Sequence, residues 1–152
     1  MHKKDKKGRV VKVAVILWTI DPENQIRFLM RHSKPFNGYD DEWTVSFGSV
    51  DPEESEILAA KREAEEEFGI REFDGDTLDL NYSTDYSGKH GPTVVHFFAM
   101  KVPNIDVKIV LNEESIGYDW MLVEKVMETM VHDDEKKAFN LLLKKIHVLK
   151  GD

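Results

Sequence analysis

A short acidic stretch carries the side chains best suited to chemistry. From Gly48 to Ile70 the chain reads GSVDPEESEILAAKREAEEEFGI. If this stretch is helical, Glu63, Glu66 and Glu67 share one face, because residues three and four positions apart are neighbours on a helix. Like charges at this spacing repel one another unless a cation lies among them. The spacing therefore indicates either a metal site or a solvated acidic surface.

The distribution of basic residues favours the metal site. A solvated charged helix face usually carries interleaved lysines. Here Lys61 and Arg62 precede the cluster, and no basic residue follows Glu65 to Glu67 before Arg71. Hard divalent cations such as Mg²⁺ and Mn²⁺ take oxygen ligands, typically a few carboxylates, water and substrate phosphates. For Glu65, on the opposite side of the helix from Glu63 and Glu67, the solvated interpretation holds.

The whole stretch resembles the Nudix box, whose pattern is G, five residues, E, seven residues and R-E-U-x-E-E-x-G-U, with U a bulky aliphatic residue. The residues that match the specified positions are Gly48, Glu54, Arg62, Glu63, Glu66, Glu67, Gly69 and Ile70. Ala64 is smaller than the usual aliphatic residue at its position. So many matches in register are far more specific than a short motif.

The resemblance implies both a fold and a set of roles. It implies the Nudix fold, an α/β/α sandwich in which the box forms loop, helix and loop. It implies that Glu63, Glu66 and Glu67 bind Mg²⁺, which Mn²⁺ can replace, with the backbone carbonyl of Phe47 or Gly48 as a further ligand. Arg62 would orient a glutamate of the box, with Glu54 the nearest candidate, so this pair is supporting. The simpler interpretation of Glu54 and Arg62 is a salt bridge at the helix start.

Strands and a capped helix are expected around the box. β-Branched residues predict strands over residues 9–19, 25–31 and 43–47, with a loop at 32–41 that forms a lid or part of a binding wall. The box helix is expected to begin near Pro52 to Ser55 and to end at Phe68, with Gly69 as C-cap. The apolar positions expected to pack on a sheet are Ile57, Leu58, Ala60, Ala64 and Phe68.

The second half of the chain predicts further strands and two helices. Strands are expected at 78–82 and 93–102, separated by a polar hairpin loop at 83–92, with a short strand at 107–111. Helices are expected at 124–130 and 134–149, the latter with an apolar stripe that packs in the core or at a dimer seam. Strands before and after one central helix indicate an α/β domain with a mixed sheet.

Composition predicts one domain spanning 1–152, with residues 1–8 as a flexible basic tail. The chain has 152 residues, no cysteine and a net charge of −8. No cysteine excludes disulfides and Cys-ligated metals and is consistent with the cytoplasm. The negative charge argues against general nucleic-acid binding. The apolar run from Val13 to Ile20 is too short to span a membrane, so we expect no membrane association. We expect either a monomer or a homodimer.

The residues that follow the box resemble a narrower group of hydrolases than the box itself does. Residues 80–130 resemble asymmetrical diadenosine tetraphosphate hydrolases, including L-N-Y and L-x-x-E-x-x-x-Y-x-W, which implies Glu114 as an extra metal ligand or base. Tyr118 and Trp120 are interpreted as packing residues. However, Ser46-Phe47-Gly48-Ser49-Val50 lacks the lysine and histidine of P-K-G-H-V and resembles dihydroneopterin triphosphate and deoxynucleoside triphosphate pyrophosphohydrolases. Asp119, Asp40 and Asp41 are alternatives to Glu114.

The predicted function is Mg²⁺-dependent hydrolysis of a phosphoanhydride bond in a nucleotide polyphosphate, such as diadenosine tetraphosphate. Alternatives are dihydroneopterin triphosphate, a nucleoside triphosphate, ADP-ribose, or a non-catalytic nucleotide sensor. Base stacking is expected from an aromatic ring and phosphate contacts from basic side chains. The candidates for stacking are Tyr82, Tyr86 and Phe36, and those for phosphate are Lys89, His90, Arg31 and Lys34.

Overall fold

One mixed sheet forms the centre of the molecule. The structure is a computed structural model that describes residues 2–35 and 42–149. Within these residues the seven-stranded sheet has the order β3-β2-β1-β6-β5, with β4 paired to β1 and β7 paired to β2. β1 and β6 run parallel, and the other paired strands are antiparallel. The strands are β1 (Val10–Ile20), β2 (Ile26–Ser33), β3 (Trp43–Thr44), β4 (Ser46–Ser49), β5 (Leu78–Gly88), β6 (Gly91–Lys101) and β7 (Ser115–Met121).

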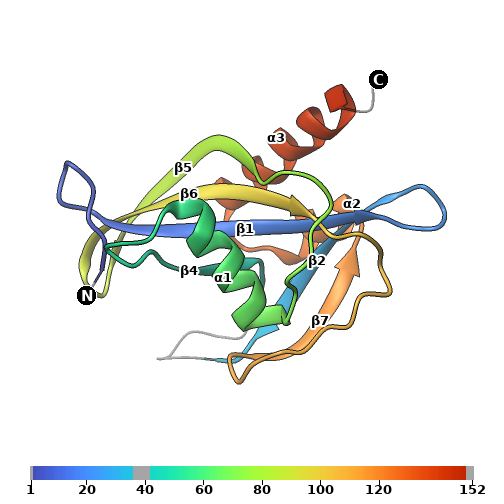
Figure 1. The fold of residues 1–152 in the computed structure, drawn as a ribbon, viewed down its shortest axis with the longest axis horizontal. Coiled ribbons are helices and arrows are strands. Elements are labelled where there is room, and N and C mark those ends of the chain that lie inside the picture. Colours follow the sequence, from blue (N-terminus) through green and yellow to red (C-terminus); the bar gives the residue numbers. More distant parts are fainter. Residues whose placement is uncertain (1, 36–41, 150–152) are drawn as a thin grey trace.

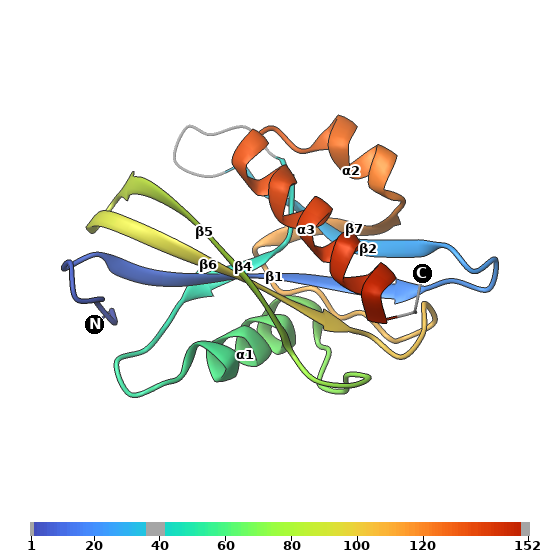
Figure 2. The same ribbon diagram turned by 90° about the horizontal axis from the view of Figure 1, so that it is seen from above.

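Helices cover both faces of this sheet. Helix α1 (Glu56–Phe68) packs on one face, while α2 (Val123–Thr129) and α3 (Asp133–Leu149) pack on the other (Figures 1 and 2). The predicted α/β/α sandwich with a mixed central sheet is therefore confirmed. None of the helices in the described ranges has the length and apolar character needed to cross a membrane.

Strand β1 is buried on both faces and divides the core in two. Val11, Val13 and Val15 belong to the cluster beneath α1. Ala14 and Ile16 belong to the cluster beneath α2 and α3. Successive side chains of a strand point to opposite faces, so a strand between two helical layers needs an almost continuous apolar run. This is why residues 10–20 are apolar except at Lys12 and Thr19.

Two predicted strand boundaries were wrong. Residues 83–92 do not form a loop, because β5 continues to Gly88 and pairs with β6 up to Gly88 opposite Gly91. Only the two residues between these glycines turn, and Gly91 has a φ of 104°, which glycine accommodates easily. Tyr86 therefore lies on a strand. The single strand expected at 43–47 is divided at Val45, where the chain moves from pairing with β2 to pairing with β1.

Two further expectations for the second half need correction. Residues 107–111 form no strand, although Val107, Ile109 and Leu111 pack against the cluster beneath α1. Strand β7 was not predicted, because its serine, glycine and aspartate interrupt the alternation of apolar residues. It pairs with β2 by backbone hydrogen bonds that do not depend on side-chain type.

Helix α1 begins and ends where expected but has a narrower apolar face than expected. The Ser55 side chain accepts a hydrogen bond from the Leu58 N–H at 3.2 Å, and Gly69 ends the helix in the left-handed conformation. Ala60, Ala64 and Phe68 are buried as expected. Ile57 and Leu58 are 43% and 58% exposed, so placing them on the packed face was wrong.

The basic N-terminal segment is attached to the domain from residue 2 onward, which differs from the flexible tail expected at 1–8. Lys4 forms a β-bridge with Val10, and Asp5 accepts hydrogen bonds from the N–H groups of Lys7 and Arg9. The Lys3 backbone N–H donates to the Val50 carbonyl at 3.0 Å. Backbone pairing of this kind joins the segment to the loop that precedes α1.

Candidate functional site

The close approach of β4 to α1 creates the carboxylate site. Glu63 is 8% exposed and lies directly against Gly48, where a Cβ atom would collide with the Glu63 carboxyl group. Gly48 is opposite Val13 in the pairing of β4 with β1, so both lie on the α1 face of the sheet. A glycine is therefore needed at position 48 for space, because any other residue would displace Glu63.

Glu67 is the most deeply buried carboxylate of the cluster, at 1% exposure. Its Oε2 accepts a hydrogen bond from the Phe47 backbone N–H at 3.0 Å and lies 3.6 Å from Nε of Arg31. Its Oε1 is buried and has no hydrogen-bond partner among the described residues. A buried carboxylate oxygen without a partner is costly, so it marks a place where a cation or a proton would be stabilised.

Arg62 connects the glutamates of the box. Its Nε and Nη2 donate to both oxygens of Glu54, at 2.8 and 2.9 Å, in a bidentate pair. Nη2 also donates to the Ser49 carbonyl, and Nη1 donates to Glu63 at 2.9 Å. Glu66 lies 3.4 Å from Nη1. Both expectations for Glu54 and Arg62, a supporting role and a salt bridge at the helix start, are compatible with this geometry, and a bidentate guanidinium fixes the orientation of the groups around it.

Burial and mutual repulsion change the pKa values of two glutamates. Burial, followed by the charge of Glu67, raises the pKa of Glu63 to about 7, against the opposing effect of Arg62. Burial also raises the pKa of Glu67 to about 7, although Arg31 and the Phe47 N–H oppose it. Arg62 acts in the other direction on Glu54 and lowers its pKa. The buried pair therefore favours a bound proton or cation, whereas Glu54 favours its arginine.

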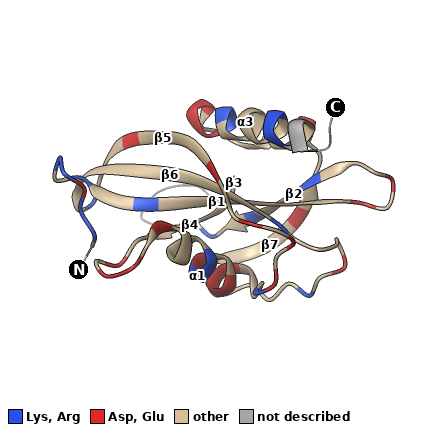
Figure 3. Cartoon of the chain, turned by 45° about the horizontal axis from the view of Figure 1, so that its top comes forward, with Lys and Arg blue, Asp and Glu red and all other residues tan. Residues whose placement is uncertain are grey.

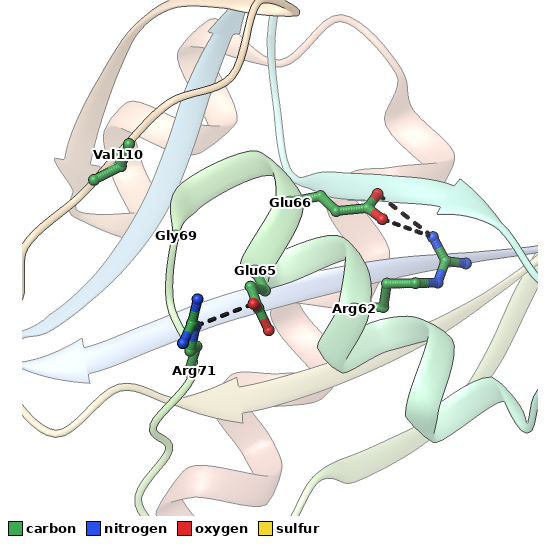
Figure 4. A pocket seen from close by; sticks show the side chains of 6 residues that line it. All are labelled: Arg62, Glu65, Glu66, Gly69, Arg71 and Val110. Atoms are coloured by element: carbon green, nitrogen blue, oxygen red, sulfur yellow. Dashed lines mark hydrogen bonds and ion pairs between the residues drawn. The ribbon is translucent and has the colours of Figure 1, made fainter.

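Glu66 and Glu65 face a cleft on the outer side of α1. This cleft has a volume of about 580 Å³ and is lined by Arg62, Glu65, Glu66, Gly69, Arg71 and Val110. Figure 4 shows Glu66 directed toward Arg62, while Glu65 is directed toward Arg71. Glu65 and Arg71 form an ion pair of 3.0 Å between two largely exposed side chains. Exposed pairs contribute little, so Glu65 has the surface role expected of it.

Glu114 approaches the cluster from outside the box. It is exposed and precedes β7, and its negative charge helps to raise the pKa of Glu67. Asp119 is opposite Met30 on the face covered by α2 and α3, and it forms an ion pair with Lys125 at 2.6 Å. Glu114 is thus an acid whose charge acts on Glu67, whereas Asp119 belongs to the opposite face of the sheet. Asp40, Asp41 and Phe36 lie outside the described residues.

The two aromatic residues of β7 differ from one another. Trp120 packs against the core beneath α1, as expected for a packing residue. Tyr118 is 46% exposed, so its interpretation as a core residue was wrong. It is opposite Arg31 in the pairing of β7 with β2, which places it on the same face as the Arg31 side chain.

The donor chemistry of the cluster fits a hard divalent cation, although its side chains do not form a ready cage. Among the described residues no three histidine, aspartate or glutamate side chains converge as metal ligands. Glu63 and Glu66 instead contact Arg62. Glu67 nevertheless has a buried oxygen with no hydrogen-bond partner in the described part of the chain, and the charges of Glu67 and Glu66 act against that of Glu63. Oxygen donors with excess negative charge are what Mg²⁺ and Mn²⁺ prefer.

Arg31 and Tyr82 were both expected to contact substrate. Their polar groups instead form hydrogen bonds within the protein. Arg31 is 7% exposed and donates to the Val45 carbonyl and to Oγ of Ser115, besides its proximity to Glu67. The Tyr82 hydroxyl donates to the Asp134 carbonyl at 2.7 Å, and its ring lies 5.5 Å from that of Phe97. Tyr82 therefore attaches β5 to α3.

Tyr86 and other candidate substrate-binding residues lie near the end of the sheet that α3 does not cover. Tyr86 is 41% exposed. Nζ of Lys12 lies 4.9 Å from the centroid of the Phe47 ring and 6.0 Å from that of Tyr86. The His90 ring lies 4.5 Å from that of His2, and Lys89 is exposed in the adjoining turn. Figures 2 and 3 show this end of the sheet extending beyond α3, with basic residues at the N-terminal segment and on β1.

Two features of the candidate site were not predicted from the sequence. The pairing of Arg31 with Glu67 joins residues far apart in the chain, and no local pattern predicts it. Lys12 had a detectable signal, because it is the one charged residue in the apolar run from Val10 to Ile20. A lone charge in a strand buried on both faces is costly unless it has partners, which here are aromatic rings.

Comparison with known proteins identifies a family and relatives for this chain. A family profile described as "NUDIX domain" matches residues 10–142. The asymmetrical bis(5'-nucleosyl)-tetraphosphatase of Rattus norvegicus is 33% identical over 101 residues, which are 63% of this chain and 65% of that protein. The chain thus spans just under two thirds of the length of this curated relative.

Solved structures share the fold at lower identity. A binary complex of Caenorhabditis elegans Ap4A hydrolase has a TM-score of 0.75 and 20% identity, covering 90% of this chain and 96% of that one. The Escherichia coli dihydroneopterin triphosphate pyrophosphohydrolase has a TM-score of 0.68 and 20% identity, covering 91% and 94%. At this identity the likeness shows the fold alone.

Proposed function

Because the chain belongs to the NUDIX domain family, we propose that it hydrolyses a phosphoanhydride bond of a dinucleoside polyphosphate such as diadenosine tetraphosphate. The observation that carries this proposal is the buried pair Glu63 and Glu67, whose pKa values are both raised and whose neighbour Arg62 is held by Glu54. The similarity to the rat tetraphosphatase supports the choice of substrate class.

The box glutamates would hold Mg²⁺, with Mn²⁺ as a substitute. Glu63, Glu66 and Glu67 supply carboxylate oxygens, and the Gly48 carbonyl is a further donor. A bound divalent ion neutralises phosphate oxygens and lowers the pKa of bound water. In our assignment Arg62 keeps Glu63 and Glu66 in place, and Arg31 orients Glu67. Glu114, which is exposed and whose charge acts on Glu67, would accept the proton of the attacking water.

The uncovered end of the sheet is the proposed nucleoside site. The Tyr86 ring and the Phe47 ring, with Lys12 between them, offer stacking surfaces and a cation. Lys89 in the adjoining turn supplies a phosphate contact. Strand β4 links this surface to the carboxylates, because Phe47 points to one face of the sheet and Gly48 to the other. A substrate bound across β4 would contact both.

A triphosphate is the second candidate substrate. The residues leading into the box, Ser46-Phe47-Gly48-Ser49-Val50, lack the lysine and histidine expected of the tetraphosphate hydrolases. The fold is also similar to that of the Escherichia coli dihydroneopterin triphosphate pyrophosphohydrolase. Such an enzyme would release pyrophosphate instead of cleaving a dinucleotide.

One substrate panel decides between these alternatives. Purified protein with Mg²⁺ is offered diadenosine tetraphosphate, dihydroneopterin triphosphate, nucleoside triphosphates, deoxynucleoside triphosphates and ADP-ribose, and the products are separated by anion exchange. ATP and AMP from the tetraphosphate support the proposal. Pyrophosphate from a triphosphate supports the second candidate. If no compound is turned over, the chain is a nucleotide sensor and not an enzyme.

We propose the cellular compartment and the type of binding partner from the composition of the chain. The absence of cysteine from all 152 residues is consistent with a reducing compartment, so we place the protein in the cytoplasm. Its partner is a small nucleotide and not a nucleic acid, because a net charge of −8 opposes binding to a phosphate backbone. Sedimentation of the purified protein distinguishes a monomer from a homodimer.

A further inference from the structure

The N-terminal segment, residues 2–9, is built against the loop that leads into α1. A compact turn organises it: the Asp5 side chain accepts from the N–H groups of Lys7 and Arg9 and from Nε of Arg9. Arg9 also contacts Asp85 on β5 at 2.6 Å. These interactions hold the segment at a defined position beside the sheet. The family profile begins at residue 10, so the segment lies outside it.

Lys3 makes the contacts between this segment and the loop. Its backbone N–H donates to the Val50 carbonyl at 3.0 Å, and its carbonyl accepts from the Val11 N–H at 2.9 Å. Its ammonium Nζ donates to the Glu54 carbonyl at 3.0 Å. The loop from residue 50 to 55 contains no helix or strand, so its conformation depends on contacts of this kind.

Glu54 transmits the position of the loop to the carboxylates. Its side chain holds Arg62 through two hydrogen bonds, and Nη1 of Arg62 contacts Glu63 and Glu66. A continuous series of contacts therefore runs from Lys3 through Glu54 and Arg62 to the proposed metal ligands. Partners that orient metal ligands are known to change metal affinity without touching the metal.

We propose that Lys3 is a positioning residue for the divalent-cation site, which it supports by holding the Glu54 backbone. This inference rests on the proposed function for the identity of the metal ligands. Without the Lys3 ammonium, the loop carries Glu54 away from the position that pairs with Arg62, and Glu63 and Glu66 lose a fixed partner. The cation then binds less tightly, while the nucleoside site at Tyr86 is unaffected.

A matched pair of variants separates positioning from simple charge. Lys3→Met removes the ammonium and keeps the aliphatic chain. Lys6→Met makes the same chemical change in the same segment, at an exposed lysine that has no side-chain hydrogen bond or ion pair within the described residues. Lys3→Arg restores a cationic donor. If Lys3 acted only by adding positive charge, Lys3→Met and Lys6→Met would have the same effect.

The test measures Mn²⁺ binding to the full chain by titration calorimetry. We expect Lys3→Met to bind Mn²⁺ about threefold to tenfold more weakly, less than the loss at a direct partner of a ligand. Lys6→Met is expected to bind like the unaltered protein, and Lys3→Arg to recover most of the affinity. KM for the nucleotide at saturating Mn²⁺ should not change. Unaltered Mn²⁺ affinity in Lys3→Met, or equal weakening in Lys6→Met, would overturn the inference.

Amide hydrogen exchange tests the positioning role of Lys3 independently of whether the protein hydrolyses a nucleotide. The Asp51 N–H donates to Glu54 Oε1 and the Glu54 N–H donates to the Asp51 carbonyl, so both amides report on the loop. We expect faster exchange at both in Lys3→Met and not in Lys6→Met. If the unaltered protein hydrolyses no nucleotide, the proposed function fails on its own, and unchanged exchange in Lys3→Met would reject the positioning role.

Discussion

At the scale of single residues, the proposed chemistry depends on two buried glutamates with unusual surroundings. Glu63 and Glu67 lie on one helix face, and each is buried, yet they have only partial compensation from Arg62 and Arg31. Protein stability alone would favour replacing such a pair with apolar residues. Buried carboxylates with raised pKa values are typical of functional sites, and here their charge would be compensated by a bound cation.

Replacing Glu67 by glutamine tests its role as a ligand. Glu67→Gln keeps the shape and removes the charge, so we expect Mg²⁺-dependent kcat to fall by at least about 100-fold, beyond the usual effect of a residue that only orients a ligand. Glu65→Gln is the matched control on the same helix and should change kcat less than about twofold, because its partner is the exposed Arg71. Full activity in Glu67→Gln would show that the ligand assignment is wrong.

The same two carboxyls predict how stability depends on pH. Their pKa values rise from 4.5 to about 7 on folding, so the folded protein binds these protons more tightly than the unfolded chain does. Their contribution is present below about 4.5 and is lost as pH rises through about 7. In EDTA, the melting temperature should therefore fall between pH 5 and pH 8, as followed by circular dichroism.

Two comparisons isolate this effect. Burial also raises the pKa of Glu135, so part of the fall belongs to that residue. The Glu67→Gln variant should show a shallower fall, and added Mg²⁺ at pH 8 should raise the melting temperature of the unaltered protein, since a ligand of the folded state stabilises it. An equally steep fall in the variant would contradict the assignment.

At the scale of elements, the contact of β4 with α1 decides where the carboxylates lie. Gly48 has no side chain, so α1 can approach until the Glu63 carboxyl lies over the strand. Ser55 and Gly69 define the ends of α1 and thereby the direction in which its glutamates point. The glycine and the caps are recognisable in the sequence. Their joint effect depends on the pairing of β4 with β1, which the sequence does not show.

Adding one methyl group at this contact should affect function more than stability. In Gly48→Ala, the new Cβ collides with the Glu63 carboxyl, which can move because it is the end of a flexible side chain. We expect Mg²⁺ affinity to fall by about tenfold or more and stability by about 1 kcal/mol. Titration calorimetry and thermal melting measure the two effects.

Gly117→Ala is the control for this substitution. A Cβ atom at position 117 on β7 meets no atom of the described residues within 4 Å, so metal affinity should be unchanged. Equal loss of affinity in the two alanine variants would mean that the effect comes from a general change in the sheet and not from the contact with Glu63.

For the whole molecule, the sheet separates the proposed chemistry from the proposed recognition. The carboxylates lie on the face covered by α1, while Phe47 packs with the cluster on the opposite face and Nζ of Lys12 lies near the rings of Phe47 and Tyr86. Figure 2 shows that one end of the sheet extends beyond α3 on that face. Loops and sheet ends that a rigid scaffold leaves open are where ligands usually bind. Changes on the two faces should therefore affect different kinetic constants.

Shortening Tyr86 tests this separation. We expect Tyr86→Ala to raise KM for diadenosine tetraphosphate about 10-fold, because stacking on an aromatic ring contributes about 1–3 kcal/mol per base. The kcat value should change little, since the carboxylates are untouched. Tyr86→Phe keeps the ring and should have a nearly normal KM. A loss of kcat with normal KM in Tyr86→Ala would contradict the nucleoside site.

The sequence alone determined the family and the α/β fold class, and from it we predicted the reaction class, a single domain and the roles of the box residues. Those conclusions depend on local spacing, because a helix brings residues three and four apart together wherever it lies in the fold. Local patterns also placed the start of α1 near Pro52 to Ser55 and its C-cap at Gly69, and the structure has the caps at Ser55 and Gly69.

The tertiary structure alone decided which side chains meet from distant parts of the chain. It paired Arg31 with Glu67, turned Asp119 away toward Lys125, exposed Tyr118 and brought Lys3 to Glu54. Such contacts follow from strand order and register, and a shift of one residue moves every side chain of a strand to the other face. Spacing along one segment carries no information about the strand that will lie beside it.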